Sequence, residues 1–149
     1  VSQIQRSLSS MQLRYEHQSQ SAIKLLNWLK QQKEFVQVLH PSDEASAGHT
    51  YWKEVCKKGH SAGLVSVILD PKYTLEDVRK FCDALTLFKL GFSWGGPVSL
   101  VMLYNLNEMR SLEHTHLKQG FLVRFCIGLE HSEDLIQDIE NAIKTLNKP

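Results

Sequence analysis

The residue with the most evident chemical potential is Arg124, which interrupts an apolar segment at positions 121–127. Side chains alternate between the faces of a strand, so Arg124 shares one face with Leu122 and Cys126 while the opposite face is apolar. An arginine with such neighbours either extends its stem to solvent or pairs with an anion. A planar guanidinium holds a carboxylate through two parallel hydrogen bonds, which a lysine does less well. The pattern alone leaves the solvent-reaching arginine and the carboxylate clamp both open.

Two other segments contain residue types that bind ligands. In Ser93-Trp94-Gly95-Gly96 the glycines permit unusual backbone dihedrals close to a ligand, although a tight loop between strands explains them equally well. In His114-Thr115-His116 the paired histidines are candidate metal ligands, but no cysteine or carboxylate has the spacing to complete a site. We therefore predict a solvated loop at these histidines and no metal.

The composition is that of one soluble globular domain. Of the 149 residues, 42% are hydrophobic and 22% charged, and the formal net charge is +1, so no general attraction to nucleic acid or membrane is expected. No apolar run approaches the roughly 20 residues that span a bilayer. Cys56, Cys82 and Cys126 lie in apolar surroundings without metal-like spacing. They predict buried free thiols in a reducing compartment, which points to the cytoplasm.

The first element that must position these residues is a long helix. Apolar residues recur at helical spacing from Val1 to Leu29. Because no capping residue precedes Val1, the helix looks cut at its start, with a frayed terminal helix as the alternative.

Beyond that helix, short strands and helices alternate. Strands are predicted at 35–39, 64–69, 87–90, 98–103 and 121–127, and helices at 49–57, 75–85 and from Ser132 onward. Thr74 and Asp77 have the spacing of a capping box, whereas residues 104–120 are polar and poorly patterned. The order predicts an α+β fold, with a small, mostly antiparallel sheet of four or five strands covered by helices on one side.

Several segments together resemble a known enzyme family over nearly the whole chain. They are Arg6-Ser7-Leu8, Leu13-Arg14, Trp28-Leu29, Gly48-His49, Trp52-Lys53, Ser61, Gly63-Leu64, 88–96, 122–130 and 133–136. The family is the cysteine/methionine-metabolism family of fold-type-I pyridoxal-phosphate (PLP) enzymes, and the Gly-His-x-x-Trp-Lys and Ser-Trp-Gly-Gly segments resemble its bacterial cystathionine β-lyase branch. The γ-lyase and γ-synthase branches usually have other residues at these positions and remain the alternative within the family.

The resemblance implies roles for four residues. Arg124 would bind the α-carboxylate of the amino-acid substrate, Ser93 would lie beside that carboxylate, and Trp94 would shape the substrate pocket. Phe92 stands where the β-lyases often have tyrosine, which removes a hydroxyl from the edge of the pocket. Pro97-Val98 replaces the more usual Tyr-Glu, so the preferred substrate is left open.

The resemblance also implies how the chain is organised. Residues 1–149 would form a single C-terminal domain that binds the substrate carboxylate, joined by its long N-terminal helix to a large PLP-binding domain. That domain would supply the Schiff-base lysine, so neither catalytic nor cofactor-binding residues are expected in this chain, which alone would be inactive.

The full-length enzyme, expected to be a homotetramer, would cleave cystathionine to homocysteine, pyruvate and ammonia in methionine biosynthesis. The alternative from another class is a non-catalytic or vestigial α+β domain that binds a small carboxylate or a protein partner.

Overall fold

A five-stranded sheet forms the centre of the computed structural model, which describes residues 2–56, 59–109 and 115–146. The strands are β1 (Phe35–Leu39), β2 (Leu64–Leu69), β3 (Lys89–Leu90), β4 (Leu100–Asn105) and β5 (Phe121–Cys126), in the spatial order β1-β2-β5-β4-β3. All neighbours are antiparallel except β3 and β4, which are parallel. The predicted α+β class and mostly antiparallel sheet are confirmed.

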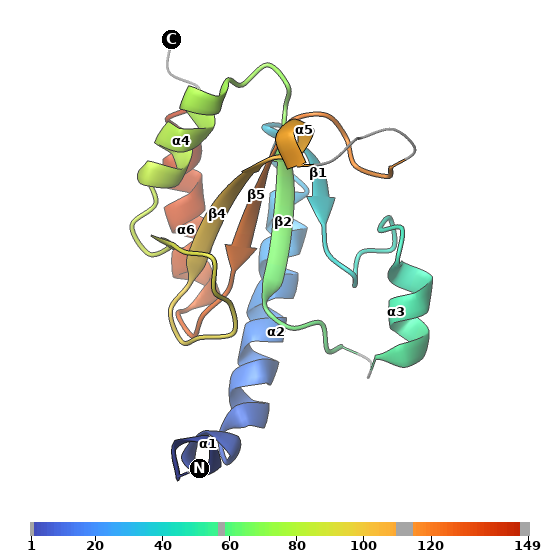
Figure 1. Cartoon of the computed structure of the whole chain (residues 1–149), viewed down its shortest axis with the longest axis vertical. Coiled ribbons are helices and arrows are strands. Elements are labelled where there is room, and N and C mark those ends of the chain that lie inside the picture. The colour runs from blue at the N-terminus through green and yellow to red at the C-terminus, as the bar shows by residue number, and fades with distance from the viewer. Residues whose placement is uncertain (1, 57–58, 110–114, 147–149) are drawn as a thin grey trace.

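One face of the sheet carries the hydrophobic core. Helices α2 (Met11–Leu29), α4 (Leu75–Asp83) and α6 (Ser132–Ile143) pack on this face, and α2 passes behind the sheet in Figure 1. The strands bury alternate side chains against them, including the fully buried Val65, Val67, Val123 and Phe125. The predicted helices therefore cover one side only.

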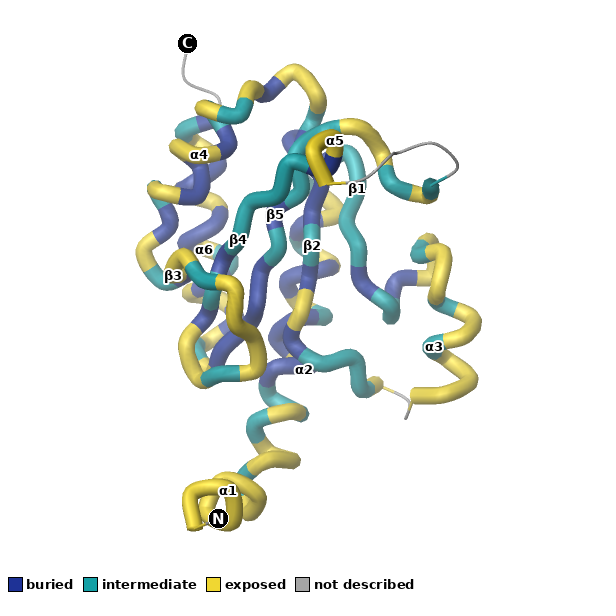
Figure 2. The backbone as a smooth tube through the Cα atoms, viewed as in Figure 1, coloured by how far each residue is buried: buried dark blue, intermediate teal, exposed yellow. Residues whose placement is uncertain are grey.

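The opposite face is only partly covered. Ser66 of β2, Arg124 of β5 and Met102 of β4 are neighbours in register, and each is half-buried. In Figure 2 the strands accordingly alternate between buried and intermediate colours. A short helix, α5 (Leu106–Met109), follows β4 within the stretch that the sequence left without a pattern.

The long N-terminal helix is confirmed over Met11–Leu29 but is interrupted before it. A separate helix, α1 (Ser2–Leu8), precedes it and bends away from its axis (Figure 1). The Ser9 hydroxyl donates to the carbonyl of Arg6, and Arg14 Nη2 donates to the carbonyl of Ser7 at 2.7 Å. These side-chain bonds satisfy carbonyls that a continuous helix would use, which explains the break.

Two helix starts show how far local signals reach. The Thr74 capping box is confirmed, since its hydroxyl accepts from the Asp77 N–H at 3.2 Å and the Asp77 carboxylate accepts from the Thr74 N–H at 2.9 Å. Helix α6 begins at Ser132 as predicted, and its N-cap residue, His131, makes no side-chain capping bond.

Helix α3 (His49–Val55) stands apart from the sheet and buries none of its residues. Cys56 directly follows α3 and is exposed, so the prediction of a buried thiol is wrong there, while Cys82 and Cys126 are buried as predicted. No helix in the described part of the chain is both long and apolar enough to cross a membrane.

Candidate carboxylate-binding site

Arg124 lies in the middle of β5, on the face of the sheet that the helices leave open. Its Nη2 donates to the carbonyl of Phe92 at 2.8 Å and to that of Gly91 at 3.4 Å. Its Nε is buried and has no hydrogen-bond partner within the part of the chain that the structure describes. A buried donor without an acceptor costs free energy. The guanidinium is thus held by one nitrogen and has an unused donor on another.

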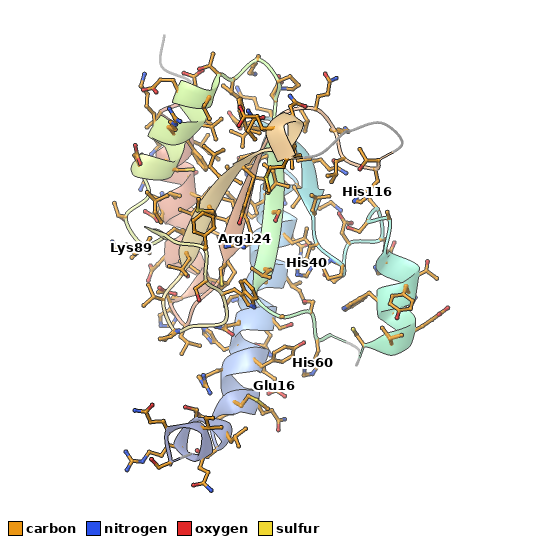
Figure 3. All side chains as sticks on the ribbon, viewed as in Figure 1. Glu16, His40, His60, Lys89, His116 and Arg124 are labelled. Atoms are coloured by element: carbon orange, nitrogen blue, oxygen red, sulfur yellow. The ribbon has the colours of Figure 1, made fainter. Side chains whose placement is uncertain are left out.

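Two aromatic side chains flank this guanidinium. Its Cζ lies 5.9 Å from the centroid of Trp94 and 5.6 Å from that of Tyr104. Ring faces attract a cation and exclude water from its sides. Arg124 is therefore held over the sheet, where Figure 3 labels it, by its bonds to Gly91 and Phe92 and by the two rings.

The Ser-Trp-Gly-Gly segment lies against the strand that carries Arg124. Gly95 has φ of 75°, in the left-handed region that favours glycine, and its N–H donates to the Sγ of Cys126 at 3.4 Å. Ser93 and Trp94 are exposed, and Phe92 contributes its carbonyl while 68% of its surface is exposed. The structure thus brings Phe92 and Trp94 into contact with the Arg124 guanidinium, and Ser93 lies between them in the chain.

A pocket of about 300 Å³ adjoins Trp94. Its walls come from the start of α2, from residues 62–64, from Trp94 and Gly95, and from Cys126 and Ile127. Burial raises the pKa of the Cys126 thiol, despite the opposing effects of the Gly95 N–H and the Arg124 charge. This thiol is therefore a neutral part of the pocket wall.

Some residues that shape the site were missed by sequence reasoning. Tyr104 lies two positions from Met102, which pairs with Arg124, so the period of two could have placed it on the same face. Asp138 accepts hydrogen bonds from the residues before β3. It lies next to Ile139 among the apolar positions of α6, and an acid at such a position is a sequence signal for a buried, hydrogen-bonded carboxylate. Gln18 and Glu130 carry no such local signal.

Every lysine that the structure describes is exposed, and Lys30 and Lys118 border an open pocket at β1. Lys89 lies at the outer edge of the sheet in Figure 3 and donates to the carbonyl of Thr86 at 2.6 Å.

The described residues also contain no group of three His, Cys, Asp or Glu side chains that could hold a metal ion. Of the two paired histidines, His114 lies outside the described residues. His116 is exposed, and its carbonyl accepts from Gln37 Nε2 at 3.0 Å.

Comparison with known proteins agrees with the fold and the motifs. The family model for Cys/Met metabolism PLP-dependent enzymes matches residues 1–144. The chain is 34% identical to cystathionine beta-lyase of Bordetella avium over 138 residues, which are 93% of this chain and 34% of that protein. It is 31% identical to cystathionine beta-lyase of Escherichia coli over 137 residues, or 91% of this chain and 34% of that protein.

A solved structure of O-acetylhomoserine sulfhydrylase from Wolinella succinogenes superposes with a TM-score of 0.76 at 27% identity. The match covers 92% of this chain and 36% of that one. The chain therefore spans about one third of the length of the curated relatives it matches. Sequence, fold and motif order lead to one conclusion: the chain belongs to the Cys/Met metabolism family of PLP-dependent enzymes.

Proposed function

We propose that this chain is the substrate-carboxylate-binding domain of a cytoplasmic PLP-dependent carbon–sulfur β-lyase. The full-length enzyme, a homotetramer with a large PLP-binding domain, would cleave cystathionine to homocysteine, pyruvate and ammonia in methionine biosynthesis. The names of the relatives support the reaction class. The observation that carries the role of this chain is Arg124, a partly buried cation between two aromatic rings with an unused Nε donor.

Carboxylate binding makes chemical use of that arrangement. A carboxylate would pair with the positive charge of the Arg124 guanidinium, and charge-assisted bonds are stronger than neutral ones. The exposed Ser93 lies on the neighbouring segment and is available as a further donor. Fixing the carboxylate orients the Cα–H bond of the substrate, which reduces the entropy lost on reaching the reactive geometry. PLP, when bound, supplies the electron sink for breaking that bond.

The pocket beside Trp94 has room for the remainder of an amino-acid substrate. Its lining is mostly apolar and includes Trp94, whose ring lies beside Arg124, and Cys126 of the same strand. Phe92, on the segment next to this pocket, carries no hydroxyl, unlike a tyrosine at that position. These features suit a thioether-containing side chain.

A matched pair of variants of the full-length protein tests this function. We expect Arg124→Lys and Arg124→Ala to raise KM for cystathionine and to lower kcat/KM by about 10- to 100-fold, the loss expected for a hydrogen bond to a charged group. Arg79→Ala, which removes an exposed arginine from α4, is the control and should leave both parameters unchanged. An unchanged kcat/KM in the Arg124 variants would show that this arginine is structural.

A second function is tested in the same assay. The chain superposes on a structure of O-acetylhomoserine sulfhydrylase, so O-acetylhomoserine is the second substrate to be tested beside cystathionine. Pyruvate formation from cystathionine supports the β-lyase. Homocysteine formation from O-acetylhomoserine and sulfide, without pyruvate from cystathionine, would assign the sulfhydrylase reaction instead.

A further inference from the structure

The connection between β3 and β4, residues 91–99, carries the proposed site and is fastened at its far end by Glu130. The Glu130 carboxylate accepts from the Ser99 N–H at 2.8 Å through Oε1 and from the Ser99 hydroxyl at 2.7 Å through Oε2. Ser99 is fully buried, so loss of these bonds would leave polar groups without partners. We infer that Glu130 is a positioning residue that holds this connection, and with it the carboxylate site, against strand β5.

Gly128 completes the attachment. Its N–H donates to the Ser99 hydroxyl oxygen at 2.8 Å. A side chain there would collide with Glu130 Oε2 and the Pro97 carbonyl, and would come within 2.6 Å of the Ser99 nitrogen. The Leu129 N–H donates to the Pro97 carbonyl at 2.8 Å. Residues 97–99 and 128–130 are thus in close contact. Only a glycine at position 128 allows the two segments to approach each other this closely.

The same strand holds the other end of the connection. Arg124 donates to the carbonyls of Gly91 and Phe92, while residues 128–130 directly follow β5. Both ends of the segment 91–99 are therefore held by residues that lie on β5 or just after it. If Glu130 releases its end, only the bonds of Arg124 to Gly91 and Phe92, of Gly95 to Cys126 and of Gln18 to Gly96 still hold the segment that carries Ser93 and Trp94.

Helix α2 supports the attachment independently. Gln18 is 93% buried, since only 7% of its surface is exposed, and its Nε2 donates to the carbonyl of Gly96 at 2.8 Å. His17 Nε2 lies 3.3 Å from the carbonyl oxygen of Glu130. These contacts hold the two segments from the helix side, so Glu130 completes a structure whose other parts are already in place.

The test compares Glu130→Gln with Glu133→Gln in the full-length protein. Both remove one negative charge near the start of α6, but Glu133 is exposed and pairs only with the surface residue Lys24 at 3.0 Å among the ion pairs described. We expect Glu130→Gln to speed hydrogen exchange at the amides of residues 91–99 and to raise KM for cystathionine about tenfold, with a smaller change in kcat. Glu133→Gln should change neither quantity.

Two measurements separate this inference from the function on which it rests. Unchanged exchange at residues 91–99 overturns the positioning role, whether or not the protein cleaves cystathionine. Faster exchange with an unchanged KM, in an enzyme that does cleave cystathionine, overturns the link to the carboxylate site. If the wild-type enzyme does not act on cystathionine, the proposed reaction fails, and the exchange data alone decide whether Glu130 holds the connection.

Ser99→Ala is a second variant that tests the same inference if Glu130→Gln does not fold. It removes only the hydroxyl that bridges Glu130 and Gly128 and leaves the Ser99 N–H bond in place. It should produce the same direction of change in exchange and KM, and wild-type values in this variant would overturn the inference.

Discussion

The buried Asp138 carboxylate holds the turn that leads into β3. It accepts from the Thr86 N–H at 2.8 Å and hydroxyl at 2.7 Å, from the Leu87 N–H at 2.9 Å and from the Phe88 N–H at 3.3 Å. A neutral amide cannot accept from all of these donors, because one of its two terminal atoms is itself a donor. We expect Asp138→Asn to lower the free energy of unfolding by about 2 kcal/mol.

Urea unfolding of the two proteins measures this difference. Glu140→Gln, an exposed change two residues further along α6, is the control and should alter the free energy of unfolding by less than about 0.5 kcal/mol. Equal stabilities for Asp138→Asn and the wild type would mean that the turn does not depend on the negative charge.

His40 makes the stability depend on pH. Burial lowers its pKa from 6.5 to about 4, with the nearby Asp43 acting in the opposite direction. The unfolded chain therefore binds a proton at a pH where the folded chain does not, so stability falls as pH drops from about 6.5 to 4. The slope in this window should reach at most about 1.4 kcal/mol per pH unit for this group.

Thermal unfolding between pH 7 and 4 tests that dependence. His40→Gln should flatten the curve in this window, whereas the exposed His116→Gln should leave its slope unchanged. A wild-type slope in His40→Gln would assign the dependence to other groups.

At the residue level, the sequence could identify Arg124 but not what surrounds it. A charge in an apolar strand stands out within seven consecutive positions, 121–127. The contact of Gln18 with Gly96 joins residues 78 positions apart in the chain, and nothing around Gln18 marks it as a partner of that segment. Such partners become visible only when the sheet and α2 have been assembled.

At the level of elements, the start of α4 was predictable because its signal is local. Thr74 and Asp77 satisfy each other's backbone groups within one turn. We expect Thr74→Ala to lower the free energy of unfolding by about 1 kcal/mol, measured by urea unfolding. Thr50→Ala in the exposed helix α3 serves as the matched control, and an equal loss in both variants would contradict a specific capping contribution.

The bounds of other elements depended on hydrogen bonds from side chains, which the spacing of apolar residues does not reveal. The apolar stripe from Val1 to Leu29 predicts a single helix, but the serine pair at positions 9 and 10 lies at the break. The apolar run at 87–90 shortened to Lys89–Leu90 because Asp138 holds residues 86–88 as a turn. Strands 35–39 and 64–69 were predicted to the residue, since proline or glycine flanks them closely.

At the scale of the whole molecule, the sheet has one face in the core and one face bearing Arg124 between the aromatic rings. All described lysines are exposed, so we expect the 149-residue chain alone to cleave no cystathionine in the presence of PLP. Pyruvate release is the measurement, with the full-length enzyme as the positive control. Pyruvate from the chain alone would contradict the assignment of cofactor chemistry to another segment.

The parallel pairing of β3 with β4 limits how the site could be redesigned. Parallel neighbours ordinarily need a connection of about a dozen residues or more, because the chain must travel back along the first strand. Here residues 91–99 suffice, since β3 spans only Lys89–Leu90 and the return path is short. With both ends of that path fixed, extra residues would have to bulge into the pocket or break an attachment. Substrate preference should therefore evolve by exchanging the exposed side chains of Phe92, Ser93 and Trp94, with the loop length conserved.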